Sequence, residues 1–286
     1  MNVLLFAGLT LRELIRRRLV AAVAVLTLVI TAFTGWGMNR LATAVVDGAP
    51  LPEPAVHAAA AGIVILLAFL FSFVIALGAA LVGAPTMAES IANGEVLAVL
   101  ARPVRRAEIV LGRWLGTLAA LAFYVAAAGA LELLVVRGET GYAPPNPSLA
   151  LAFLCAVGAI VTTGAIALAT RLPALTAGIV AAMLFGLAWI GGILQTIGLA
   201  LGNARLADAG TIVALLFPSD ALWRGALYAL QPAAFTAAAA NVNGSGTGVN
   251  PFAVTSAPPQ AILWWAAAWT IAVLTTGVAL FRTRDL

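Results

Sequence analysis

The chain of 286 residues contains no lysine, one histidine and one cysteine, and only 9% of its residues are charged. All 15 of its basic residues are arginine. A Walker-type ATPase needs a lysine to reach the β- and γ-phosphates, and a Schiff-base enzyme needs a lysine amine, so both classes are excluded. His57 and Cys155 alone cannot supply a His/Cys zinc cluster or an intrachain disulfide.

What the chain has in excess is apolar sequence, since 63% of its residues are hydrophobic. Soluble domains keep roughly a quarter of their residues charged, so this composition predicts lipid as the solvent. The net charge of +4 does not indicate nucleic acid as a partner, because the arginines stand at the ends of apolar runs rather than along one face.

Six apolar runs are long enough to cross a bilayer, which takes about 20 helical residues. The runs are continuous and rich in Ala, Leu and Val, which predicts helices rather than the alternating strands of a barrel. We therefore expect an all-α integral membrane protein in which residues 1–286 form a single transmembrane domain. The expected spans are residues 19–41, 57–84, 107–136, 148–170, 172–200 and 259–281.

The placement of arginine predicts the orientation, because cytoplasmic loops carry an excess of basic residues. With the N-terminus inside, 11 arginines fall on the inner side and four on the outer side. The four outer ones are Arg40, Arg137, Arg205 and Arg224. We therefore expect a multi-pass protein of the cell membrane with both termini in the cytoplasm.

Residues 2–18 precede the first span and carry an apolar and a polar helical face. This pattern predicts an amphipathic helix in the inner interface. A secretory signal peptide is the alternative, but the apolar run is too long for an h-region, and Trp36, Asn39 and Arg40 do not suit a cleavage region. The charged residues that we assign to this interfacial helix are Arg12, Glu13, Arg16 and Arg17.

A charged segment, residues 86–116, separates the second and third spans. Thr86 follows a proline and has Glu89 three residues later, which is the spacing of a capping box, and Pro103 provides a second break. We expect a short helix over residues 86–101 that receives force from a soluble partner. An ordinary positive-inside loop held by lipid headgroups is the alternative. The candidate coupling residues are Glu89, Asn93, Glu95, Arg102, Arg105 and Arg106.

The outer segment, residues 201–258, contains one predicted helix. Pro218 and Asp220 mark its start, it ends near Leu230, and Asp220 and Arg224 form an i,i+4 surface pair. An apolar stripe on this helix predicts that it lies in, or dips into, the outer interface.

Glu132 and Gln195 are polar residues inside predicted spans. Any intramembrane ionisable group is a functional candidate, but Glu132 lies five residues before Arg137, so we expect the two to pair at the outer interface. Gln195 faces either a substrate path or a neighbouring helix, and we expect the second.

Separated segments of the chain resemble the permease subunits of ATP-binding-cassette (ABC) exporters, in the type 2 permease superfamily. Residues 10–18 are similar to the amphipathic entry helix of that family, and residues 281–286 resemble its short basic tail. Pro218, Asp220 and Arg224 resemble a Pro-Asp-Arg segment before the last span. The most specific similarity lies between the second and third spans, at Glu89, Gly94, Leu100, Arg102, Pro103, Arg106, Glu108, Gly112, Arg113 and Gly116.

The resemblance implies a type V exporter fold, with an interfacial connecting helix, a cytoplasmic coupling helix at 86–101 and a re-entrant outer helical segment before the last span. It implies a permease that is not an enzyme and binds no cofactor. ATP and Mg would bind two copies of a cytoplasmic ATPase subunit. A second permease copy would complete the transporter, as a homodimer or, alternatively, as a pair with a different permease.

The implied function is export of a hydrophobic or amphipathic substrate, such as a drug or a lipid-like molecule, which suits spans with few polar residues. One alternative is a permease that supports maturation of a metalloprotein outside the membrane. The other is an integral-membrane enzyme, for which the interiors of the spans offer Glu132 and Gln195 but no His, no Asp and no paired carboxylates.

Overall fold

The computed structural model describes residues 2–94, 104–237 and 254–284. Nearly all of these residues are helical, and six helices are long and apolar enough to cross a membrane, which confirms an all-α integral membrane protein. The six spans are α2 (Arg18–Ala42), α3 (Glu53–Ala92), α5 (Arg106–Thr140), α6 (Pro147–Ala169), α7 (Ala174–Ala200) and α11 (Gln260–Arg282). Each coincides with a predicted span, and α3 extends furthest beyond its predicted limits, by four residues at its start and eight at its end.

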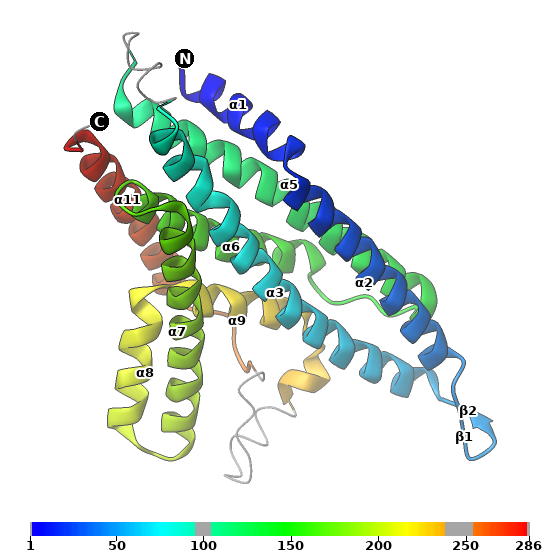
Figure 1. The fold of residues 1–286 in the computed structure, drawn as a ribbon. Helices are drawn as coiled ribbons and strands as arrows, with labels where there is room; N and C mark the ends of the chain where they lie inside the picture. Colours follow the sequence, from blue (N-terminus) through cyan, green and yellow to red (C-terminus); the bar gives the residue numbers. More distant parts are fainter. Residues whose placement is uncertain (1, 95–103, 238–253, 285–286) are drawn as a thin grey trace.

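The bundle is built around α6 (Figure 1). In its most apolar stretch 61% of the α6 residues are buried, against 11% in both α2 and α11, which lie at the periphery. α6 packs against α3, α5, α7 and α9 (Ser219–Leu230). The two chain ends lie at the same end of the bundle. We call it the basic end, because α1, the start of α5, the α6–α7 turn and the end of α11 bring together most of the described arginines.

The first helix, α1 (Asn2–Arg16), confirms the helix predicted over residues 2–18, and it lies along α5. Two glycines of α5 allow this contact. A Cβ atom at Gly112 would lie 2.3 Å from the Cβ of Phe6, and one at Gly116 would lie 2.5 Å from the carbonyl oxygen of Ala7. Small residues let helices approach closely where lipid removes the hydrophobic driving force.

The predicted helix start at Thr86 is wrong, because α3 continues without interruption through Pro85 to Ala92. A proline inside a membrane helix removes one backbone hydrogen bond, and packing against neighbouring helices compensates for it. Here Ala84 and Met87 are fully buried in the main core. The hydroxyl of Thr86 donates to the carbonyl of Gly83 at 2.6 Å instead of capping a new helix.

α3 ends at Asn93 and Gly94, inside the predicted coupling helix. The amide of Asn93 donates to the carbonyl of Glu89 at 2.8 Å, and Gly94 has φ = +72°. A left-handed glycine directly after a helix is a common helix terminator. The remainder of the predicted coupling helix, including Glu95, lies outside the described residues, and so does the candidate coupling residue Arg102.

The outer segment contains a helix that the sequence did not predict, α8 (Ala204–Leu216), in addition to α9, which confirms the predicted helix at 219–230. Asn203 starts α8 by accepting a hydrogen bond from the amide of Leu206 at 3.2 Å. α8 returns alongside α7, and α9 then turns by 96° into the bundle (Figure 1). A bent pair of this kind has the geometry of a re-entrant segment or of a broken span.

The turn between α8 and α9 falls at Phe217 and Pro218, because the residue before a proline is pushed out of the helical region. Two of the carbonyl groups at the end of α8 accept hydrogen bonds from α11. Trp265 and Trp269 donate their indole N–H groups to the carbonyls of Leu215 and Leu216 at 3.0 Å and 2.9 Å.

At the end opposite the basic end, a short hairpin pairs β1 (Val45–Val46) with β2 (Ala49–Pro50). The Asp47-Gly48 turn has positive φ at both residues, as a tight two-residue hairpin requires.

Tyr142, between α5 and α6, donates its hydroxyl to the carbonyl of Leu230 at 3.3 Å, and burial raises the pKa of this phenol.

We predict that Gly116→Ala destabilises the protein, because its new methyl group would meet the backbone of α1. The expected loss is about 1–3 kcal/mol, typical of overpacking. The matched control is Gly186→Ala in α7, where a Cβ atom meets nothing within 4 Å. The measurement is the midpoint of thermal unfolding in detergent. Equal midpoints for the two variants would contradict the close approach of α1 and α5.

Candidate functional site

Four charged side chains form one cluster at the basic end, which we call the elbow cluster: Glu13, Arg17, Glu89 and Arg113. The guanidinium of Arg17 donates to Glu13 Oε1 at 2.6 Å and to Glu89 Oε2 at 2.9 Å. Arg113 lies 3.7 Å from Glu13 Oε2 and donates to the carbonyl of Thr86. The cluster therefore connects α1, the end of α3 and the first turns of α5.

Arg17 lies at the centre of the elbow cluster, at the break between helices α1 and α2. Its backbone is extended (φ −73°, ψ 130°), so the two helices meet there at a break. Burial lowers the pKa of Arg17, but its hydrogen bonds to Glu13 and Glu89 outweigh that effect and raise it. Arg17 thus carries its full charge and holds two carboxylates from separate elements.

A second group of contacts at the basic end binds the last helix to the rest of the bundle. Arg106, at the start of α5, donates to the carbonyls of Phe281, Arg282 and Arg284 at 3.0, 3.0 and 2.8 Å. A cation near the C-terminus of a helix is favourable, because the last carbonyls there are unpaired.

The same group reaches the turn between α6 and α7. Arg284 donates to the carbonyl of Thr170 at 2.5 Å, and Arg171 donates to the hydroxyl of Thr283 at 2.6 Å. The ends of α5, α6 and α11 are therefore linked through arginine side chains at one level of the molecule.

The structure divides the predicted coupling residues between several roles. Glu89 pairs with Arg17, Asn93 ends α3, and Arg106 caps α11. Arg105 precedes α5, and its backbone amide donates to Glu108 Oε2 at 3.1 Å. Of the residues assigned to the interfacial helix, Glu13 and Arg17 belong to the elbow cluster, whereas Arg12 and Arg16 are exposed.

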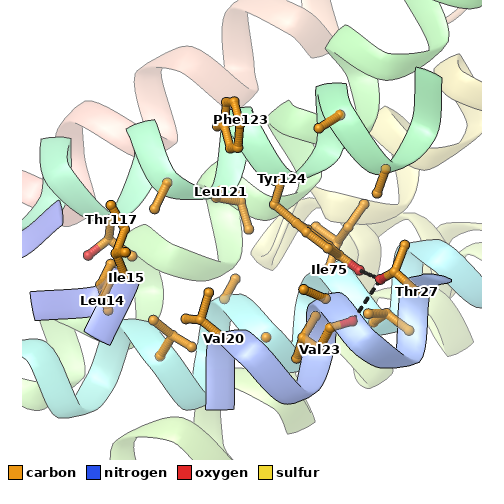
Figure 2. Close-up of a pocket in the computed structure, with 18 of the residues that line it drawn as sticks. Leu14, Ile15, Val20, Val23, Thr27, Ile75, Thr117, Leu121, Phe123 and Tyr124 are labelled. Carbon is orange, nitrogen blue, oxygen red and sulfur yellow. Dashed lines mark hydrogen bonds between the residues drawn. The ribbon is translucent and has the colours of Figure 1, made fainter. Parts of the chain in front are cut away.

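A cavity of about 660 Å³ lies between α1, α2, α3 and α5, and its lining is almost entirely apolar. Figure 2 shows Tyr124 of α5 pointing toward Thr27 of α2, with 2.8 Å between the two hydroxyl oxygens. The Thr27 hydroxyl already donates to the carbonyl of Val23, so Tyr124 is the donor to Thr27. Phe123, also in the lining, is 76% exposed, so the cavity opens at the surface of the bundle.

A second cavity of about 480 Å³ continues the first along α2, toward the end opposite the basic end. The two cavities together form what we call the α2 groove. Glu132 lines the second cavity, and within the described residues its Oε1 atom is buried without a hydrogen-bond partner. The expected pair between Glu132 and Arg137 is therefore wrong. The residues that line both cavities are Val23, Thr27, Val74, Tyr124 and Ala128.

The outer segment holds a buried ion pair rather than the predicted surface pair. The side chain of Asp220 is 4% exposed and that of Arg224 is 20% exposed, and Arg224 Nε donates to Asp220 Oδ2 at 2.8 Å. Arg224 also donates to the carbonyl of Gly192 at 2.7 Å and to the hydroxyl of Thr196 at 3.1 Å. The pair therefore fastens α9 to α7, and Pro218 starts α9 beside it.

Gln195 behaves as predicted, because its side-chain amide joins two helices. Its Nε2 atom donates to the hydroxyl of Thr211 in α8 at 2.9 Å. Sequence reasoning missed the hydroxyl groups of the α2 groove, above all Tyr124 and Thr31. The sequence signal that could have indicated them is the set of threonines at 27, 31 and 34 of α2, which are spaced about one turn apart and so share one helix face.

We predict that Asp220→Ala costs about 3–5 kcal/mol of stability, because it leaves the Arg224 guanidinium buried without its carboxylate. The exposed Asp208→Ala in α8 is the matched control, with an expected change within about 0.5 kcal/mol. Replacing both partners, with Asp220→Leu and Arg224→Met, should cost less than Asp220→Ala alone. Thermal unfolding in detergent measures all three variants, and equal midpoints for the two aspartate variants would contradict a buried pair.

The chain was compared with models of known protein families and with curated proteins, and neither comparison gives a match.

Proposed function

We propose that this chain is the permease subunit of an ABC exporter, in which a separate cytoplasmic ATPase subunit hydrolyses ATP and this chain carries the substrate. The observation that supports the proposal best is the elbow cluster, in which Arg17 bonds Glu13 and Glu89 at 2.6 Å and 2.9 Å. The resemblance of residues 89–116 to the family's opening motif covers the same region. In this proposal the basic end faces the cytoplasm of the cell membrane.

The contacts at the basic end provide a path for force. A partner that pushes on the connection between α3 and α5 displaces Glu89, and Arg17 passes that displacement to the break between α1 and α2. Arg106 passes it to the end of α11. Small shifts at such a point become rigid-body movements of packed helices, because packed interfaces adopt discrete arrangements. The ATPase subunits bind two such permeases, which are expected to be identical copies.

The α2 groove supports a hydrophobic or amphipathic substrate. Its first cavity, of about 660 Å³, lies within the range of drug-sized ligand pockets, about 300–1,000 Å³. Its walls are apolar, with polar atoms at a few positions such as Tyr124 and Glu132. Ligand pockets commonly combine an apolar lining with a few oriented polar groups.

Purification of the full chain from its native membrane in nanodiscs tests the proposal directly. We expect a soluble subunit with a P-loop to co-purify, and ATP hydrolysis by the complex. A chain that is recovered without any ATPase under ATP-trapping conditions would overturn the proposal and favour a stand-alone membrane function.

We predict that Glu89→Arg uncouples hydrolysis from export, because it places a second cation against Arg17. ATP hydrolysis by the complex should continue, and the amount of substrate exported per ATP should fall several-fold. Glu53→Arg is the matched control, since Glu53 lies at the opposite end of the same helix and its side chain is 83% exposed.

Both Glu89→Arg and Glu53→Arg should insert into the membrane at the level of the unmodified protein. An unchanged ratio of export to hydrolysis in Glu89→Arg would show that the elbow cluster takes no part in coupling.

A further inference from the structure

The α2 groove contains two oxygen atoms that lack hydrogen-bond partners. Thr31 Oγ1 on α2 and Glu132 Oε1 on α5 are both buried and unpaired within the described part of the chain, and both residues line the second cavity. A buried polar atom without a partner costs about 1–3 kcal/mol, and a charged one costs more. Apart from the hydroxyl groups of Thr27, Thr34 and Tyr124, the remaining residues of this cavity are apolar, and none of those hydroxyls bonds to either oxygen.

The register of α2 against α5 places these two residues within about one helical turn of each other along the groove. Two hydrogen bonds between the helices fix that register: Thr27 with Tyr124 at 2.8 Å, and Asn39 with Glu139 at 2.9 Å. Both helices run away from the basic end, so the residues between these two pairs face each other in order (Figure 1). Thr31 lies one turn after Thr27, and Glu132 lies about two turns after Tyr124, so about one turn separates the two residues in the cavity that both line.

Aromatic side chains line the same cavity. Phe71 and Tyr124 have ring centroids 5.8 Å apart, and Phe33 lies on the α2 side. Aromatic faces attract cations, with a larger effect where water is excluded. A carboxyl group, a hydroxyl group and aromatic rings around one apolar cavity complement an organic cation and oppose an anion.

We propose that the α2 groove binds an amphipathic organic cation, a molecule with a primary or secondary ammonium group on an aromatic or alkyl body. Its N–H groups donate to Glu132 Oε1 and Thr31 Oγ1, which satisfies both oxygens. Its apolar body lies along the groove toward Tyr124 and the first cavity. The role of this cation as an exported substrate rests on the proposed function above, whereas its binding does not depend on an ATPase.

The test measures binding to the full chain in phosphatidylcholine nanodiscs, without any partner subunit. The probe is dansylcadaverine, a primary ammonium on an aromatic body. Its uncharged N-acetyl derivative is the neutral analogue, which we call the neutral twin. We expect the cation to bind about tenfold more tightly than the twin, because charge-assisted hydrogen bonds are the stronger ones. Glu132→Gln should weaken binding of the cation by about tenfold and leave the twin unchanged.

Two further variants keep the test decisive. Glu53→Gln is the matched control, because Glu53 lies at the exposed start of α3 and lines neither cavity of the groove. It should bind both probes as the unmodified chain does. Thr31→Val removes the second oxygen. It should weaken binding of the cation and leave binding of the neutral twin unchanged. The cation should also raise the thermal midpoint of the unmodified chain, and Glu132→Gln should abolish that rise.

Equal affinity for the cation and its neutral twin would overturn the proposal, and the groove would then hold an apolar molecule such as a lipid chain. An unchanged affinity of Glu132→Gln for the cation would also overturn the proposal. Cation binding through Glu132 in a chain that recruits no ATPase would support this site and refute the exporter. An ATPase complex whose chain shows no cation preference would refute this site and leave the exporter proposal standing.

Discussion

The hydrocarbon of a membrane offers no hydrogen bonds, so every backbone group within it must find its partner inside the protein. This constraint explains why α3 passes through Pro85 without ending and why helices end mainly at the two faces of the bundle. The exception, at Phe217 and Pro218, lies within the bundle, and there two tryptophans of α11 supply donors to the free carbonyls. The re-entrant segment depends on that replacement.

Close approach of helices follows from the same constraint. Lipid is as apolar as leucine, so helices associate through packing and hydrogen bonds rather than through a hydrophobic driving force. Gly116 allows α1 to lie against α5, and Gly198 allows α7 to lie against α8, where an added Cβ atom at Gly198 would lie only 2.3 Å from the backbone nitrogen of Ala207. α2 is packed far less tightly, with 11% of its most apolar stretch buried, and the groove lies along it.

The charged residues separate into those that hold the structure and those that remain available. Arg17 and Arg106 join elements far apart in the sequence, and Arg224 and Asp220 fix the re-entrant helix in place. The oxygen of Glu132 stands apart, because it is buried among apolar side chains without a donor. This contrast is the basis for proposing force transmission at the basic end and ligand recognition in the groove.

The sequence alone determined the six spans, because span length and apolar composition follow directly from the thickness of the hydrocarbon layer. It determined the helix at 219–230 from a local helix-start signal. It also located the charged segment after the second span, since charge is excluded from lipid. Only the tertiary structure decided which polar groups meet, as with Arg17 and Glu89, 72 positions apart. It likewise decided that Pro85 does not end α3, that α8 folds back on α7, and that Glu132 faces a groove. These outcomes depend on contacts between distant helices, whose packing energies no local pattern of residues contains.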